Sequence, residues 1–135
     1  MQDPCPCAGF IYASCCAPLH RGERQAATAE QLMRSRYSAY AVGEVEYLLQ
    51  TQPSAVPLAR RRRELAASIG QLRWQRLQIL AVTDGGPHDL SGTVTFEAHY
   101  VAAGQPGVMR ECSLFGREGN SLEGGWLYLE ALELD

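Results

Sequence analysis

The sequence contains no lysine, and all twelve of its basic residues are arginine. We attribute this absence to the composition of the genome, although arginine also suits bidentate contacts to anions. Long apolar runs are lacking as well, and no stretch approaches the roughly 20 residues that a membrane-spanning helix needs. A secretion signal is not recognisable either, because residues 1–4 have neither a basic end nor an apolar run. We therefore expect a cytoplasmic protein without a membrane partner.

Charge is spread unevenly along the chain, although the net charge is only −3. Residues 1–80 hold ten arginines and six acids, whereas residues 81–135 hold two arginines and nine acids. With 135 residues, of which 46% are hydrophobic, the chain is large enough for one domain with a core of its own.

Cysteine is concentrated near the start of the chain, where four of the five cysteines fall within twelve residues: Cys5, Cys7, Cys15 and Cys16. Such a short segment has too little apolar content to fold alone, so another interaction must hold it. Four thiolates at this spacing can close a tetrahedral Zn²⁺ site. Because four protein ligands leave no position for water or substrate, such a zinc ion would be structural rather than catalytic.

Other interpretations of the cysteines stay open. Disulfides between adjacent or nearly adjacent cysteines would be strained, and they would need an oxidising compartment. A redox pair usually has C-x-x-C spacing beside a βαβ pattern, which this chain lacks, but redox-active or adventitious thiols remain an alternative. His20 could replace one sulfur as a ligand, although Pro18 restricts its approach.

Several motifs resemble a known family. The order Cys-Pro-Cys, glycine, aromatic residue and Cys-Cys is similar to the zinc knuckle (SEC-C motif) at the carboxyl end of the SecA translocation motor. Residues 28–40 (TAEQLMRSRYSAY) resemble the bacterial YchJ family, in which such a knuckle leads straight into a helix. Further similarities lie at residues 92–98, 111–115 and 125–128, so the resemblance spans nearly the whole chain.

This resemblance implies a fold but little chemistry. It implies a zinc knuckle over residues 1–20 and a nuclear-transport-factor-2-like (NTF2-like) domain over residues 21–135, in which helices pack on a curved antiparallel sheet to form a cone. The chain departs from the family pattern at several places, among them Ala8-Gly9-Phe10, where the family usually has Gly-Ser-Gly. Only seven residues separate Cys7 from Cys15, one fewer than is usual, and Thr51-Gln52-Pro53 replaces a His-Pro pair.

The hydrophobic periodicity independently predicts an α+β class. Helices are expected over residues 28–42, 44–50 and 58–69, with Thr28 and Gln31 as a capping box and Gly43 as the end of the first helix. Residues 17–27 read as a polar connector. Alternating segments joined by turns predict antiparallel strands over residues 72–82, 92–101, 108–115 and 126–132.

The first helix carries polar side chains on its apolar stripe, namely Arg36, Tyr37 and Tyr40. One interpretation is that the tyrosines pack while Arg36 pairs with a buried carboxylate, most plausibly Glu97 or Glu111. The other is that Arg36, Tyr37 and Tyr40 line a polar pocket. The sequence alone favours the first interpretation.

Three functions are consistent with these features. The preferred one is a zinc-bearing binding or adaptor module for a protein partner or a small ligand, with apolar Phe10, Ile11 and Tyr12 either docking a partner or stapling the segment to the domain. The first alternative is an enzyme whose cone cavity uses Glu97, His99 or Glu111 for acid–base chemistry. No nucleophile or phosphate-binding loop is recognisable, which favours binding over catalysis. The second alternative is RNA binding through Arg60, Arg61, Arg62 and Arg63, which the acidic net charge disfavours.

Overall fold

Helix α2 (Ala29–Val42) lies at the centre of the computed structural model, which describes residues 3–135. The Thr28 hydroxyl accepts a hydrogen bond from the Gln31 backbone N–H at 3.0 Å, so the expected N-cap is confirmed. The Gln31 side chain reaches back to the backbone N–H of Ala27 and holds the entry to the helix. The helix ends at Gly43, whose φ of 86° is left-handed and therefore favours glycine.

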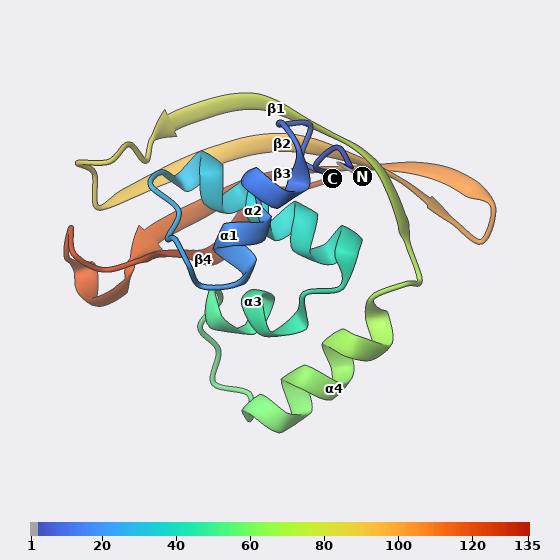
Figure 1. The fold of residues 1–135 in the computed structure, drawn as a ribbon, viewed down its shortest axis with the longest axis horizontal. Helices are drawn as coiled ribbons and strands as arrows, with labels where there is room; N and C mark the ends of the chain where they lie inside the picture. Colours follow the sequence, from blue (N-terminus) through green and yellow to red (C-terminus); the bar gives the residue numbers. More distant parts are fainter. Residues whose placement is uncertain (1–2) are drawn as a thin grey trace.

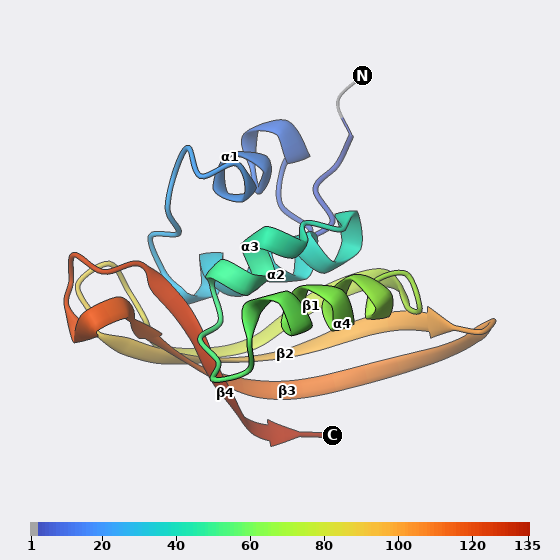
Figure 2. The same cartoon turned by 90° about the horizontal axis from the view of Figure 1, so that it is seen from below.

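The sheet is a four-stranded antiparallel meander in the order β1-β2-β3-β4 (Figure 1). Its strands are β1 (Arg73–Asp84), β2 (Ser91–Ala102), β3 (Gln105–Arg117) and β4 (Trp126–Leu134). Register shifts interrupt the β1–β2 pairing on both sides of Leu77 and the β3–β4 pairing near Cys112. Such bulges bend strands, and Figure 2 shows the curved sheet with the helices all on one face. The predicted α+β class is therefore confirmed.

Two further helices agree with the sequence pattern, whereas the pattern did not predict a third, short helix. Helices α3 (Val45–Gln50) and α4 (Leu58–Ser68) lie close to their expected positions. The polar connector expected over residues 17–27 is wrong in its first part, because Ala17–His20 forms the short helix α1 after the 3-10 turn η1 (Tyr12–Ser14). Ala17 and Leu19 are buried, so this turn of helix is part of the core. A second 3-10 turn, η2 (Glu118–Asn120), precedes β4.

The core has two halves because α2 is buried on both sides. One side of α2 faces the sheet, where Val94, Phe96 and Phe115 are buried. The other side faces α1 and α3, which contribute Leu19 and Leu48 to the same hydrophobic cluster. No helix within residues 3–135 is long and apolar enough to cross a membrane.

Candidate metal centre and ligand pocket

The four clustered cysteines converge on one point. Their Sγ atoms all lie within 4.8 Å of one another. The Cys7 and Cys15 sulfurs are 3.6 Å apart, and those of Cys15 and Cys16 are 4.0 Å apart. Tetrahedral zinc with Zn–S bonds of about 2.3 Å requires sulfur–sulfur distances of about 3.8 Å. The four sulfurs therefore have the spacing of a tetrahedral thiolate site, and the shortened loop between Cys7 and Cys15 does not prevent it.

The backbone of this segment turns tightly around the sulfurs. The Cys5 N–H donates to the Phe10 carbonyl at 2.8 Å, and the Ala8 N–H donates to the Cys5 carbonyl at 3.1 Å. A Cβ atom on Gly9 would lie 2.8 Å from the Cys15 sulfur and 3.2 Å from the Cys7 sulfur. Only glycine fits this close approach, so the glycine of the motif is required by the thiol cluster itself.

The thiols share protons unequally. A hydrogen bond from the Cys16 thiol lowers the pKa of Cys7 to about 5. The same interaction raises the pKa of Cys16, since the donor keeps its proton. The thiols of the cluster therefore differ in acidity, and a bound cation would displace their protons.

His20 lies near the cluster but does not join it. Its Nε2 atom is 2.8 Å from the Ser35 carbonyl oxygen, and its Nδ1 atom is 2.8 Å from the Tyr12 hydroxyl. A carbonyl can only accept, so Nε2 carries the proton and Nδ1 accepts from Tyr12. Burial lowers the pKa of His20, which favours this neutral form. With both nitrogens engaged, His20 connects the cysteine segment to α2 instead of acting as a ligand.

Further contacts bind the cysteine segment to α2. The Arg34 guanidinium donates to the Cys7 carbonyl at 2.7 Å, and the Cys5 sulfur lies 3.6 Å from the Ser38 hydroxyl. Cys5, Cys7 and Cys16 belong to the main hydrophobic cluster of the protein. Of the three apolar residues expected at the tip, only Phe10 is fully exposed, at 85%.

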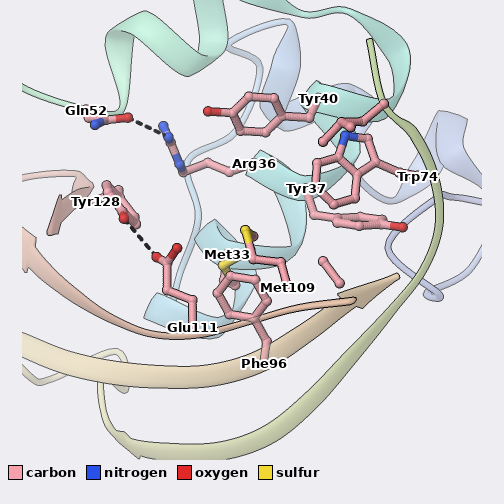
Figure 3. Close-up of a pocket in the computed structure, with 12 residues that line it drawn as sticks. Met33, Arg36, Tyr37, Tyr40, Gln52, Trp74, Phe96, Met109, Glu111 and Tyr128 are labelled. Carbon is pink, nitrogen blue, oxygen red and sulfur yellow. Dashed lines mark hydrogen bonds between the residues drawn. The ribbon is translucent and has the colours of Figure 1, made fainter. Parts of the chain in front are cut away.

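A pocket of about 340 Å³ lies between α2 and the concave face of the sheet (Figure 3). Its wall is mostly aromatic and apolar, with a few polar groups. The lining residues are Met33, Arg36, Tyr37, Tyr40, Gln52, Leu72, Trp74, Phe96, Ala98, Met109, Glu111 and Tyr128. Arg36, Tyr37 and Tyr40 therefore share one cavity.

Arg36 is buried, as the sequence suggests, but the expected contact with a carboxylate is wrong. Its guanidinium donates to the Leu48 carbonyl at 3.1 Å, the Thr51 hydroxyl at 2.7 Å and the Gln52 side-chain oxygen at 2.8 Å. The guanidinium carbon also lies 4.9 Å from the centre of the Tyr128 ring. Burial lowers the pKa of Arg36, because its acceptors are neutral oxygens that only partly replace water.

Glu111 enters the same pocket from β3. One oxygen of its carboxylate, Oε2, accepts hydrogen bonds from the Ser113 hydroxyl and from the Tyr128 hydroxyl, the latter at 2.8 Å. Burial and the bond to Glu111 raise the pKa of Tyr128, so this phenol stays a donor. In Figure 3 the carboxylate points into the cavity, opposite Arg36.

The expected placement of Glu97 and His99 in the cavity is wrong. Phe96 and Ala98 line the pocket, and strand alternation directs their neighbours Glu97 and His99 to the opposite, convex face. There the His99 Nε2 atom is 3.9 Å from a Glu97 oxygen and 3.2 Å from the Arg76 guanidinium. Of the three acid–base candidates, only Glu111 reaches the pocket.

The arginine run of α4 is largely engaged with neighbouring groups. Arg60 forms a salt bridge with Glu64, and Arg62 forms a bidentate salt bridge with Glu46. Arg61 donates to the Gln52 carbonyl at 2.7 Å. Most of the positive charge is therefore compensated or used structurally, which weakens the case for a phosphate-binding surface.

Among the pocket residues that sequence reasoning missed are Gln52, Trp74 and Tyr128. The strand period shows only that Tyr128 shares a face with Trp126, two residues earlier, and the structure shows that Trp126 is buried. No local pattern marks Gln52, whose position depends on the path of the loop after α3.

Comparisons with known proteins agree with this architecture. The family model described as "YchJ, middle NTF2-like domain" matches residues 28–131. A UPF0225 protein of Corynebacterium glutamicum is 44% identical over 130 residues, which is 95% of each chain. A UPF0225 protein of Streptomyces coelicolor is 40% identical over 133 residues, covering 98% of this chain and 97% of the relative.

Two solved structures share the fold. The solution structure of a SEC-C motif containing protein from Rhodopseudomonas palustris has a TM-score of 0.77 at 29% identity and covers 100% of both chains. The crystal structure of a SEC-C motif containing protein from Psychrobacter arcticus also has a TM-score of 0.77, at 24% identity, over 95% of this chain and 81% of that one. Because the family model covers most of the chain and the relatives match along nearly their whole length, this protein belongs to the YchJ family (UPF0225), with its NTF2-like domain over residues 28–131.

Proposed function

We propose that this protein is a zinc-bearing binding protein that takes a small ligand in the pocket between α2 and the sheet. The observation that carries the proposal is the pocket itself. Its volume of about 340 Å³ is within the range of ligand sites, which extends from about 300 to 1,000 Å³. Ligand sites are typically apolar and aromatic with a few placed polar groups, and Arg36 and Glu111 are such groups here.

Binding fits this pocket better than catalysis does. Acid–base chemistry usually needs two groups that converge on one reacting atom. Glu111 is in the pocket, whereas Glu97 and His99 lie on the other face of the sheet. The polar groups that face the cavity are suited to orienting a ligand.

The cysteine cluster completes the proposal. Cys5, Cys7, Cys15 and Cys16 would hold one Zn²⁺ ion, which would be structural because all four positions are filled by protein. The bound ion would fix the amino-terminal segment against α2, the helix that supplies Arg36 and Tyr37 to the pocket. Zinc needs reduced thiols, which suits a protein of the cytoplasm.

A protein-docking role for the knuckle is the second candidate. It is favoured by the 85% exposure of Phe10 at the tip of the cysteine segment. Tyr12, by contrast, is bonded to His20, and the main chain of Ile11 pairs with Pro4. One exposed aromatic ring is a small anchor, so we rank docking below ligand binding.

The ligand-binding proposal can be tested by methyl NMR with protein labelled at methionine. Met33 and Met109 both line the pocket, and their signals can be assigned from Met33→Leu and Met109→Leu variants. We expect members of a library of one- and two-ring compounds to shift both signals together in a saturable way. Titrations in which no compound shifts either signal would overturn the proposal.

A further inference from the structure

The positive charge of the pocket has no carboxylate in contact with it among residues 3–135. Arg36 is only 4% exposed, and its three acceptors are the neutral oxygens of Leu48, Thr51 and Gln52. A guanidinium has five N–H groups, so two of them are left over. Buried charges are normally paired, which leaves this cation in need of an anion.

The negative charge of the pocket is also incompletely used. Glu111 is 8% exposed, and both of its hydrogen-bond donors, Ser113 and Tyr128, bond to the same oxygen, Oε2. Within the described chain Oε1 has no donor, and the carboxylate faces the cavity in Figure 3. A carboxylate oxygen is an acceptor, so this position calls for a donor from a ligand.

Tyr128 contacts both charged groups. Its ring lies under the Arg36 guanidinium, and its hydroxyl is bonded to Glu111. The wall of the cavity therefore has two separate polar groups: the Arg36 guanidinium, which can bind an anion, and the Glu111 carboxylate, which can accept a hydrogen bond. Another part of the wall is built from aromatic rings, among which Trp74 packs against Tyr37 at 5.7 Å and Tyr40 at 6.5 Å between ring centres.

We propose, on the basis of the ligand-binding function above, that the ligand is a small aromatic carboxylate that carries a hydroxyl or amino group on its ring. The carboxylate takes the free N–H groups of Arg36, the ring packs against the aromatic wall, and the ring substituent donates to Glu111 Oε1. An arginine fork suits a planar carboxylate, and ring packing adds affinity beyond apolar burial.

Other ligand classes satisfy the pocket less well. A cation would meet Arg36, and a neutral apolar compound would leave both charged groups unpaired. A phosphate ester would add roughly two negative charges to a cavity that already contains Glu111, and Arg36 has only two free N–H groups to bind it. The size of the cavity, at the lower end of the usual range, also favours one or two rings.

The test compares four probes of matched size by calorimetry and by the methyl shifts of Met33 and Met109. The probes are 4-hydroxybenzoate, 4-aminobenzoate, benzoate, which lacks the donor, and 4-hydroxybenzamide, which lacks the charge. We expect the first two to bind about tenfold or more tightly than either benzoate or the amide, because hydrogen bonds to charged groups are worth about 1.5–3 kcal/mol.

Variants of Glu111 and Arg36 test which residue binds the ring substituent of the ligand and which binds its carboxylate. Glu111→Gln, whose amide oxygen is a weaker acceptor than a carboxylate, should narrow the difference in affinity between 4-hydroxybenzoate and benzoate. Arg36→Lys, which keeps the charge but loses the fork, should weaken both acids about tenfold. Arg63→Met, on the exposed face of α4, is the control and should bind all probes as the wild type does.

The outcomes separate this inference from the proposed function. Benzoate binding as tightly as 4-hydroxybenzoate would overturn the role of Glu111, and the amide binding as tightly as the acid would overturn that of Arg36. If none of the four probes shifts Met33 and Met109 while other library compounds do, the inference fails and the binding function stands. If no compound of either set shifts them, both fail.

Discussion

Arg36 and Glu111 are opposite charges in one pocket, and Tyr128 contacts both of them. The Tyr128 ring lies 4.9 Å from the Arg36 guanidinium carbon, and its hydroxyl donates to Glu111 at 2.8 Å. A direct ion pair would have paired both charges within the protein. The contacts that are present instead leave free N–H groups on Arg36 and a free oxygen on Glu111.

The first prediction concerns the partners of Arg36. Because its acceptors are neutral, Arg36→Met should reduce the free energy of unfolding by about 1–3 kcal/mol, less than the 3–5 kcal/mol typical of a broken buried ion pair. Urea denaturation measures this difference. Arg63→Met, an exposed change in α4, should stay within about 0.5 kcal/mol of the wild type. A loss above about 4 kcal/mol for Arg36→Met would mean that a carboxylate does depend on this arginine.

The second prediction concerns the bond between Tyr128 and Glu111. Tyr128→Phe should cost about 1.5–3 kcal/mol, because the lost hydroxyl bonds to a buried charged group. In a double-mutant cycle with Glu111→Gln, the two losses should not add, since both changes alter one hydrogen bond. Tyr100→Phe is a suitable control, because residues 3–135 supply no hydrogen-bond partner for the Tyr100 hydroxyl. Strictly additive losses would show that the bond is absent in solution.

The third prediction concerns the metal. Protein purified without added metal should contain about one zinc per chain by elemental analysis, because four sulfurs are already arranged for it. Cys16→Ser should lower this content sharply, whereas Cys112→Ser, which changes the one cysteine outside the cluster, should not. Zinc in fewer than about half of the wild-type chains, with oxidation excluded, would contradict a closed zinc site.

The fourth prediction concerns the division between residues 1–20 and 21–135. Deleting residues 1–20 removes Leu19 and three buried cysteines from the cluster that contains Leu32 and Tyr47. Since each large apolar side chain contributes about 1.5–3 kcal/mol, the truncated chain should lose its cooperative thermal transition. Phe10→Ser is the control, because the exposed ring should not affect stability. A truncated chain that melts at the wild-type temperature would instead favour a separable docking knuckle.

The fifth prediction concerns His20 and pH. Burial lowers the pKa of His20 in the folded protein, so unfolding makes its protonation easier. Its contribution to stability is therefore complete above about pH 6.5, the usual pKa of histidine, and is lost as the pH falls below that value. His20→Gln, which retains a donor for the Ser35 carbonyl, should lack this part of the pH dependence. Zinc content must be followed in parallel, and identical slopes for both proteins would contradict the prediction.

Local signals account for much of the fold. Thr28, Gln31 and Gly43 mark the ends of α2 because capping depends on neighbouring residues. The inner face of β2 follows from its alternation, which places Phe96 and Ala98 in the core. Helix α1 could not be predicted in this way, because Leu19 is buried only when the cysteine segment has folded against α2.

The candidate site was less accessible to sequence reasoning. The polar residues on α2 correctly indicated a special stripe, and the cysteine spacing indicated a cluster. The partners of Arg36 come from a loop, however, and the position of Gln52 is set by tertiary contacts that no short pattern encodes. The sequence does not place Glu97 and His99 correctly, because strand alternation shows which residues share a face but not which face is concave.

Helix α4 has a consequence for how the pocket opens. All of its residues are exposed or half-buried, and the chain that contains it is inserted between two pocket-lining residues, Gln52 and Leu72. Segments with little burial open locally at low free energy, so the amide protons of residues 58–68 should exchange with solvent well before those of β2. Local opening of this segment would release Gln52 and Leu72 from the pocket wall while the sheet and α2 keep their packing.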